Sequence, residues 1–240
     1  MSTASQTPDT VRPIESRLLS ERVTIELRRS ILSGALPPGL SLSLRKLADQ
    51  LGVSFIPVRD ALRVLEGEGL VVNPPGRSAT VAPLDLGEFH AIYRVRRMLE
   101  PDLARRSCAA LADEELDRLF QAAAEFGGHD RSMDDIYDDH RAFHMALLAP
   151  AASTWDSRIL LMLWRAGERY VRIGFGLLDP DPDEHERRRE AHQLLIEEFR
   201  KRDPENAARA LDEHLAHNED LAAAALLGSL DAIAHATREG

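Results

Sequence analysis

Four histidines are spaced so that their side chains can share one metal ion. His140 and His144 are four residues apart in DDHRAFHMALL, which places them on one face of a helix. His192 in REAHQLLIEEF and His214 in ARALDEHLAH lie in two later segments with helical periodicity. Such a pair and two single histidines from neighbouring helices can converge in a bundle core, and neutral imidazole suits Zn, Ni, Cu or Fe. Taken alone, each histidine is more often a surface or packed core residue.

A second group of residues suits nucleic-acid binding. The stretch LADQLGVSFIPVRDALRVLEGEGLV is typical of a helix-turn-helix, with two short amphipathic segments joined at Gly-Val-Ser. On the second segment Phe55, Arg59 and Arg63 follow at i, i+4 and i+8, with Ile56 beside them, so they share the face opposite the apolar one. Because the N-terminal part of such a helix enters the major groove, we expect Arg59 to contact a base or a phosphate.

A β-hairpin wing is predicted directly after the helix-turn-helix. The stretches LVV and SATVA alternate like two short strands around Pro74-Pro75-Gly76-Arg77, and Arg77 is placed to contact the DNA backbone or the minor groove. The alternative is that these arginines are solvated and that the winged fold binds protein. The corner, the helix cap, the wing and the arginines together favour DNA.

Helical periodicity and stop signals predict the elements that carry the DNA-binding residues. The first helix stops at Gly34, Ser43 caps the second, and Gly52 suits the left-handed corner. Ser54 caps the third. The three predicted helices cover Arg17–Ser33, Leu44–Leu51 and the segment from Ser54 to about Glu68.

A domain boundary is predicted near Pro83, where the Gly- and Pro-rich stretch NPPGRSATVAP gives way to almost uninterrupted helical periodicity. Helices of this length form a bundle rather than an α/β enzyme core. The six predicted helices are Leu86–Ala110, Asp113–Phe126, Ser132–Leu148, Ser153–Gly176, Asp183–Arg202 and Pro204–Leu227.

The composition limits the class of protein. Its 240 residues, 44% of them hydrophobic, suffice for one large or two modest globular domains. Cys108 is the only cysteine, so no intrachain disulfide can form, and we expect a packed thiol and a reducing, cytoplasmic compartment. The first residues lack the apolar core of a secretion signal, and no apolar run approaches the roughly 18 residues that span a membrane.

The charge of the chain is unevenly distributed. Residues 1–84 hold 10 Lys and Arg against 8 Asp and Glu, whereas residues 85–240 hold 20 against 32. Exposed charges more than about 8 Å apart are screened at physiological salt, so phosphate binding depends on the local field. The nearly neutral first part can therefore bind DNA although the whole chain has a net charge of −10. We expect this binding to be salt-sensitive and to need two copies of the chain.

The N-terminal motifs resemble those of the GntR family of transcription regulators. The matching text, ILSGALPPGLSLSLRKLADQLGVSFIPVRDALRVLEGEGLV, has the family's Gly-x-x-x-Pro-Gly turn, Leu-Ala-x-x-Leu-Gly-Val-Ser corner and Pro-Val-Arg-x-Ala-Leu-x-x-Leu recognition helix. The resemblance spans roughly residues 15–82 and implies a DNA-binding regulator. The residues that we expect to contact DNA are Arg45, Ser54, Phe55, Ile56, Arg59, Arg63 and Arg77.

Two residues depart from the GntR pattern. The family usually has Arg and then Thr or Ser before Pro-Val-Arg, whereas this chain has Phe55 and Ile56. Apolar side chains at these positions would contact thymine methyl groups or flank the groove. Either arrangement would shift the reading of the operator towards Arg59 and the wing.

The helical region resembles the C-terminal ligand-binding domain of FadR-type regulators, called the FCD domain. That family has Arg-x-x-x-Glu on its first helix, here Arg96 and Glu100, then Asp-x-x-Phe-His, and two later histidines. The last three landmarks fall on Phe143-His144, His192 and His214. The resemblance implies that these histidines bind a divalent metal, for which we expect Zn or Ni.

The family's acidic ligand falls on His140, which leaves three readings of the metal site. The site has four histidines, or three, or Asp139 replaces the acidic ligand from the next position. Because Asp139 would point about 100° away from His140 on an ideal helix, we prefer the four-histidine reading.

In the FCD family the metal usually sits in a cavity where it binds a small organic acid. We expect Arg96 to hold the other end of this carboxylate effector, since a guanidinium pairs with a carboxylate through two hydrogen bonds. Glu100 accompanies Arg96, and Arg169 or Arg172 can assist. For the latter two, the alternative is an outward-facing charge on a long helix.

The resemblance implies a homodimeric, ligand-controlled regulator, expected to be a repressor, that binds double-stranded DNA at an inverted repeat. Two alternatives are a regulator for which the metal is itself the signal and a metal-dependent hydrolase or oxygenase with a fused winged module. The second lacks a convincing general base or nucleophile beside the histidines. The expected fold is mainly α, with a disordered leader at 1–14, a winged helix-turn-helix domain at 15–83, an antiparallel six-helix effector-binding and dimerisation bundle at 84–228 and a flexible tail at 229–240.

Overall fold

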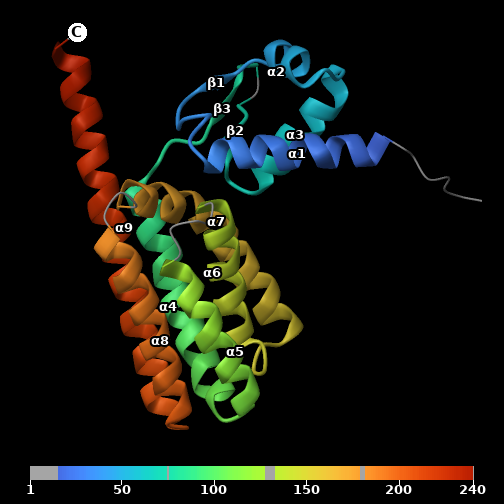
Figure 1. Cartoon of the computed structure of the whole chain (residues 1–240). Coiled ribbons are helices and arrows are strands. Elements are labelled where there is room, and N and C mark those ends of the chain that lie inside the picture. Colours follow the sequence, from blue (N-terminus) through green and yellow to red (C-terminus); the bar gives the residue numbers. More distant parts are fainter. Residues whose placement is uncertain (1–15, 75, 128–132, 179–181, 240) are drawn as a thin grey trace, which may run out of the picture.

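The computed structural model describes residues 16–74, 76–127, 133–178 and 182–239. The leader expected at 1–14 lies outside these residues. Within them the chain forms a small N-terminal domain of three helices and three strands and a larger domain made only of helices (Figure 1). The prediction of a mainly α fold is confirmed.

The N-terminal domain is a winged helix-turn-helix. Its helices are α1 (Ser16–Leu32), α2 (Leu44–Leu51) and α3 (Phe55–Gly67), and its strands are β1 (Ser41–Leu42), β2 (Val71–Val72) and β3 (Ala79–Val81). The strands form one antiparallel sheet in the order β1-β3-β2, in which Thr80 pairs with Ser41 on one side and Val72 on the other. Strand β1 was not predicted, because two residues are too short to show an alternating pattern.

Local signals set the corner between α2 and α3. The Ser43 hydroxyl accepts a hydrogen bond from the Lys46 backbone N–H, and Gly52 adopts the left-handed conformation at φ 65°. Ser54 occupies the predicted cap position of α3, but its side chain makes no capping hydrogen bond. An N-cap side chain bonds the N–H of the second or third helical residue, and the third residue here is Pro57, which has no N–H.

The core of the N-terminal domain fixes the orientation of α3. Val58, Leu62 and Leu65 are buried against a set that includes Leu47 and Ala48 of α2. Burial of one face of α3 leaves the opposite face exposed to solvent.

The second domain is a helical bundle. Its elements are α4 (Leu86–Cys108), α5 (Asp113–Ala124), the 3-10 turn η1 (Glu125–Gly127), α6 (Met133–Leu148), α7 (Thr154–Leu178), α8 (Pro182–Arg200) and α9 (Pro204–Glu239). Helix α4 packs against α6, α7 and α9, and α5 packs against α6 and α8. The Cys108 thiol is buried in this core, as expected for a packed cysteine.

Helix α9 continues well past its predicted end near Leu227. It runs to Glu239 and extends beyond the other bundle helices (Figure 1). The flexible tail expected at 229–240 is therefore helical up to Glu239. A single Gly228 costs a helix only about 1 kcal/mol, and the residues after it include no proline. No helix in the described part of the chain is long and apolar enough to cross a membrane.

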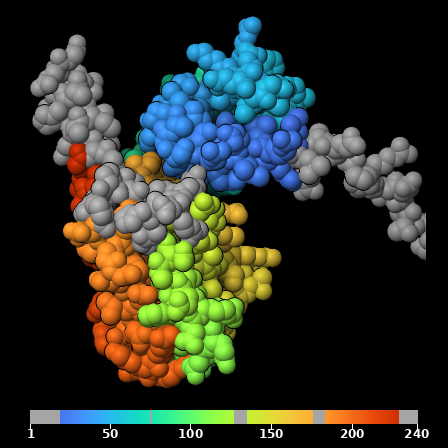
Figure 2. Space-filling view, in the orientation of Figure 1, coloured from blue at the N-terminus to red at the C-terminus, as the bar shows by residue number. Residues whose placement is uncertain are grey.

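The two domains meet at one end of the bundle, where Figure 2 shows the N-terminal domain as a separate mass above the helices. Helix α1 packs against α7. The Arg169 guanidinium on α7 donates to the backbone carbonyl of Ala82 (3.0 Å) and to the carboxylate of Glu88 (2.7 Å), and Tyr170 also contacts Glu88. These contacts fix the segment between the domains onto α7.

Candidate metal centre and DNA-binding surface

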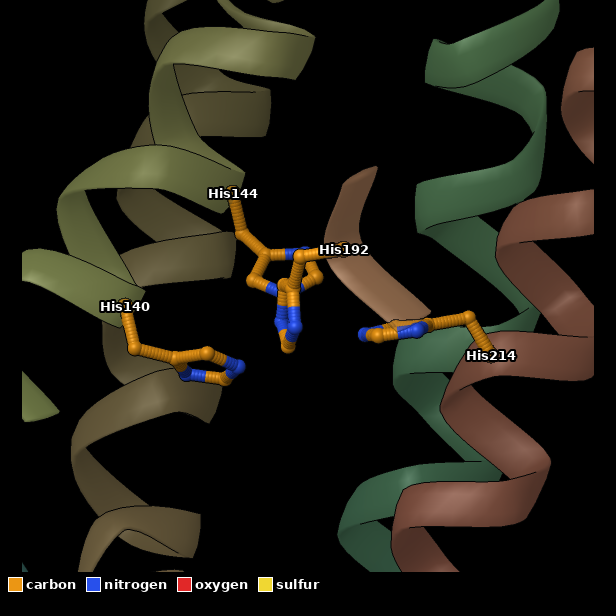
Figure 3. Close-up of side chains that lie close together, drawn as sticks. All are labelled: His140, His144, His192 and His214. Carbon is orange, nitrogen blue, oxygen red and sulfur yellow. The ribbon is translucent and has the colours of Figure 1, made fainter. Parts of the chain in front are cut away.

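His140, His144, His192 and His214 form one buried histidine cluster. Two come from α6, one from α8 and one from α9, and their rings point toward a common centre (Figure 3). One ring nitrogen from each lies within 4.8 Å of those of the other three. The Nε2 atoms of His144 and His192 lie 3.3 Å apart. The sequence pattern of an i, i+4 pair and two single histidines is thus brought together by three helices.

The histidine cluster is held in its neutral form. Burial is the main cause that lowers the pKa of all four imidazoles, and the charges of neighbouring histidines and arginines mostly act in the same direction. The pKa of His192 falls to about 4, and the others fall well below the ordinary value of 6.5. Neutral imidazoles offer lone pairs to a metal at physiological pH.

Surrounding groups orient the rings. His192 donates from Nδ1 to the backbone carbonyl of Arg188 (2.7 Å), which leaves its Nε2 for a metal. The buried Nδ1 of His144 has no hydrogen-bond partner in the described residues. Phe126 packs its ring against His140 and His192. Four neutral nitrogen donors fit a late first-row divalent ion.

The position of Asp139 supports the four-histidine reading. Its side chain is exposed on α6 and does not join the histidine cluster, whereas His140 is buried within it. Adjacent helical residues point about 100° apart, so only one of the two can face the centre.

A cavity of about 90 Å³ opens beside the histidine cluster and is lined by His140, His192 and Arg188, among others. This volume is several times the roughly 10–15 Å³ that one water needs, so the cavity suits a small molecule. Arg188 is buried, and none of its three guanidinium nitrogens has a hydrogen-bond partner in the described residues. Glu184, one turn earlier, is paired with Arg187 instead (3.0 Å). A buried cation without a counterion favours binding of an anion.

Arg96 and Glu100 lie close to the histidine cluster but pair with each other. Arg96 Nε lies 2.6 Å from Glu100 Oε1, both side chains are buried, and the guanidinium stacks on the Trp164 ring at 4.0 Å. Arg96 lines a small cavity together with His140. The carboxylate that we expected Arg96 to take from an effector is thus already supplied by Glu100.

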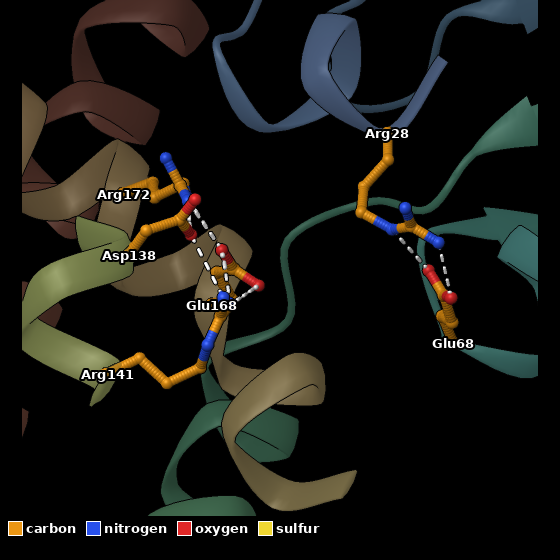
Figure 4. Close-up of polar contacts among 6 residues, drawn as sticks. All are labelled: Arg28, Glu68, Asp138, Arg141, Glu168 and Arg172. Atoms are coloured by element: carbon orange, nitrogen blue, oxygen red, sulfur yellow. Dashed lines mark hydrogen bonds and ion pairs between the residues drawn. The ribbon is translucent and has the colours of Figure 1, made fainter. Parts of the chain in front are cut away.

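The other two expected effector-binding arginines are also engaged elsewhere. Arg169 bonds the segment between the domains, as described above, and does not line either cavity beside the histidines. Arg172 bonds Glu168 and Asp138, both at the cleft between the domains (Figure 4). It also lines the small cavity with Arg96 and His140.

Sequence reasoning missed Arg188, although a signal was present. It lies four residues before His192, so both residues share one face of α8. Arg188 is the middle one of three consecutive arginines, and helix phase alone distinguishes it from Arg187 and Arg189.

The DNA-binding residues expected from the sequence lie on the surface of the winged domain. Ser54, Phe55 and Ile56 are exposed at the start of α3. The four exposed arginines have no side-chain ion pair or hydrogen bond within the ranges that the structure describes; they are Arg45, Arg59, Arg63 and Arg77. Most arginines of the bundle, in contrast, pair with a carboxylate. Unpaired cations on one small domain suit contact with phosphates and base edges.

Two family profiles match this chain. The family described as "Bacterial regulatory proteins, gntR family" matches residues 19–81, and the one described as "FCD domain" matches residues 91–217, more than half of the chain. The HTH-type transcriptional regulator McbR of Escherichia coli K12 is 28% identical over 210 residues, covering 83% of this chain and 90% of that protein. The gluconate operon transcriptional repressor of Bacillus licheniformis is 25% identical over 201 residues, 80% of each chain.

Solved structures share the fold. The structure of E. coli McbR/YncC has a TM-score of 0.66 at 23% identity, covering 85% of this chain and 96% of that chain. A GntR-family regulator from Pseudomonas syringae pv. tomato DC3000 has a TM-score of 0.52 at 25% identity, covering 92% and 91%.

Proposed function

The chain belongs to the GntR family of bacterial regulatory proteins and carries an FCD domain. We therefore propose that a small organic acid, bound beside a metal ion, controls its affinity for operator DNA. It is a DNA-binding transcriptional regulator rather than an enzyme. In the proposal it is a cytoplasmic repressor that binds an inverted repeat as a homodimer.

The histidine cluster would hold the metal, for which Zn²⁺ or Ni²⁺ is proposed. The support is the donor set: four buried, neutral imidazoles from three helices with nitrogens within 4.8 Å of one another. When bound, such an ion supplies a Lewis-acidic position for one oxygen of a carboxylate.

Arg188 carries the proposal that the effector is an anion. Its guanidinium lines the same cavity as His140 and His192 and has no partner among the described residues. A carboxylate would satisfy the guanidinium with two hydrogen bonds and remove the cost of a buried, unpaired charge. The cavity volume of about 90 Å³ limits the effector to a small acid.

Helix α7 connects the cavity to the DNA-binding domain. Phe175 of α7 lines the cavity, and Arg169, less than two turns earlier, holds the carbonyl of Ala82 between the domains. An effector that binds better to one position of α7 would therefore shift the population of DNA-competent dimers.

An apolar stripe on α7 is the proposed contact between two copies. Trp155, Ile159 and Met162 follow at i, i+4 and i+7 and are 68%, 38% and 62% exposed. Exposed apolar residues that share one helix face are typical of an interaction surface. A dimer would place two α3 helices against two half-sites.

A regulator that senses the metal itself is the second candidate. Four histidines can supply all four ligands of a closed tetrahedral site, which would leave no position for an acid. In that case the metal alone would change the DNA affinity, and Arg188 would not affect the response.

The test measures DNA affinity by fluorescence anisotropy on a duplex selected from a random library with the full-length protein. A panel of small carboxylic acids is titrated into the metal-loaded complex. We expect at least one acid to release DNA from the wild type and to need at least tenfold more in Arg188→Ala. Arg189→Ala is the matched control, because Arg189 is also next in sequence but pairs with Glu186 and does not line the cavity.

An equal response in Arg188→Ala and Arg189→Ala would contradict the role of Arg188. Release of DNA by the metal alone, with no further effect of any acid, would favour the metal sensor.

A further inference from the structure

Phe55 and Ile56 are two large apolar side chains on the same exposed face of α3 as arginines that are unpaired in the described part of the chain and suit a polyanion. Phe55 and Ile56 are 50% and 65% exposed at the N-terminal end of α3. At about 100° per residue, Phe55, Ile56, Arg59 and Arg63 fall within one arc of roughly 100°. The buried residues of α3 occupy the other side of the helix. The apolar pair and the two arginines therefore form one reading face.

Folding of the domain does not account for this apolar pair. The two side chains lie outside the buried core of the winged domain, to which α3 contributes Val58, Leu62 and Leu65. Exposed apolar surface costs free energy in water, and that cost is recovered when a ligand covers it. The neighbouring Arg59 and Arg63 have no side-chain partner within the described residues, so the same ligand must also suit unpaired guanidinium groups.

The major groove of DNA offers both kinds of group side by side. Its base edges carry hydrogen-bond donors and acceptors, and its one apolar group is the C5 methyl of thymine. A guanidinium pairs with the O6 and N7 atoms of guanine, whereas an apolar side chain contacts the thymine methyl. The match of residues 19–81 to the gntR family favours DNA over a protein partner as the ligand of this face.

We infer that Phe55 and Ile56 read thymine methyl groups in the operator, next to the base pair that Arg59 contacts. Arg59 follows these residues by three or four positions, which is about one turn, or about 5.4 Å along the helix. Base pairs rise by about 3.4 Å, so the thymines lie within one or two base pairs of the Arg59 contact. The inference rests on the DNA-binding function and is independent of the metal and the effector.

The test replaces thymine by deoxyuridine, which removes only the methyl group and keeps the hydrogen-bonding edge. The duplex selected from a random library is synthesised with thymine or uracil at each half-site position, and dissociation constants are measured for the full-length protein. Burial of one methyl group corresponds to about a fourfold change in affinity. We expect the wild type to bind the uracil duplex about fourfold more weakly per contacted methyl, and Phe55→Ala/Ile56→Ala to bind both duplexes equally.

Two control variants separate methyl contact from general loss of binding. Arg59→Ala should weaken binding to both duplexes while it keeps the thymine preference. Val64→Ala should change neither value, because Val64 is exposed on the same helix but lies about 180° from Phe55.

Equal affinity of the wild type for thymine and uracil duplexes overturns the inference but leaves DNA binding intact. The same holds if the selected half-site has no thymine within two base pairs of the position that Arg59→Ala affects. Failure to select any duplex overturns both the inference and the DNA-binding function. If the thymine preference persists in Phe55→Ala/Ile56→Ala, other residues read the methyl groups and the inference fails.

Discussion

Arg188 illustrates what a single buried charge requires of its surroundings. Without an anion its guanidinium is buried and has no partner among the described residues, and such a charge costs several kcal/mol that an apolar residue of similar size would not. We therefore predict that Arg188→Met raises the free energy of unfolding of the ligand-free protein by about 1–4 kcal/mol, as measured by urea denaturation. Arg187→Met should change it by less than about 0.5 kcal/mol.

The comparison of Arg188→Met with Arg187→Met also defines the result that would contradict this prediction. If Arg188→Met is clearly less stable than the wild type, the guanidinium has a structural partner and is not held ready for an anion.

The neutral histidines predict how stability depends on pH. Their folded-state pKa values lie below the ordinary 6.5, so the unfolded chain takes up protons first as the pH falls. The stability of the metal-free protein should be constant with respect to these groups above about pH 7. It should then fall between pH 6.5 and about 4, the pKa of His192, by about 1.4 kcal/mol per pH unit for each histidine.

Urea unfolding at pH 7.5, 6 and 5 after treatment with a chelator measures this slope. The variant His144→Ala/His192→Ala lacks two of the four groups, so its stability should change less steeply with pH. Identical slopes for the variant and the wild type would show that these histidines are not held neutral by the fold.

At the scale of elements, two glycines of α7 test how closely the helices pack. A methyl group on Gly174 would lie 3.0 Å from the Ala222 carbonyl oxygen and 3.1 Å from its Cα on α9, whereas one on Gly167 would meet only the Ile92 side chain, at 3.5 Å. We predict that Gly174→Ala lowers the free energy of unfolding by about 1–3 kcal/mol, because backbone atoms must move. Gly167→Ala should raise it by up to about 1 kcal/mol through helix propensity.

Thermal or urea unfolding of the two variants measures the difference directly. Equal stabilities for Gly174→Ala and Gly167→Ala would mean that α7 and α9 are not in backbone contact at this point.

Sequence patterns could predict the elements and the pair His140 and His144 because both depend on short-range spacing, whereas His192 and His214 were joined to this pair through the resemblance to the FCD domain. The spacing of His140 and His144 places both side chains on one helix face. The helix cap at Ser43 and the left-handed turn at Gly52 likewise depend on only a few neighbouring residues. Partners from distant segments could not be predicted in this way. Arg169, for example, was expected to bind the effector. Its actual partner, the Ala82 carbonyl, lies 87 positions away in the sequence, and no local pattern shows that contact.

Individual residues explain the remaining differences between the predicted and the observed elements. Pro57 removes the N–H that Ser54 would cap, and the sequence after Gly228 continues α9 where a flexible tail was expected. Arg188 was missed because the choice among three consecutive arginines depends on which face of α8 the bundle buries.

At the scale of the whole molecule, the stripe formed by Trp155, Ile159 and Met162 should hold two copies together. A charge at Met162 would have to be buried in that contact, so Met162→Asp should raise the dimer dissociation constant at least tenfold in analytical ultracentrifugation. Leu194→Asp is the matched control, since Leu194 is as exposed but lies on α8. A dimer that persists in Met162→Asp, or that is lost only in Leu194→Asp, would place the interface elsewhere.

The most direct test of the metal-dependent account is native mass spectrometry of the purified protein. The account predicts one Zn²⁺ or Ni²⁺ ion per chain, retained in the control His90→Ala, whose imidazole is exposed on α4, and lost in His144→Ala/His192→Ala. An additional small mass in the wild type that disappears in Arg188→Ala would identify the bound acid. A wild type that carries no metal, even after incubation with zinc or nickel salts, would contradict the account.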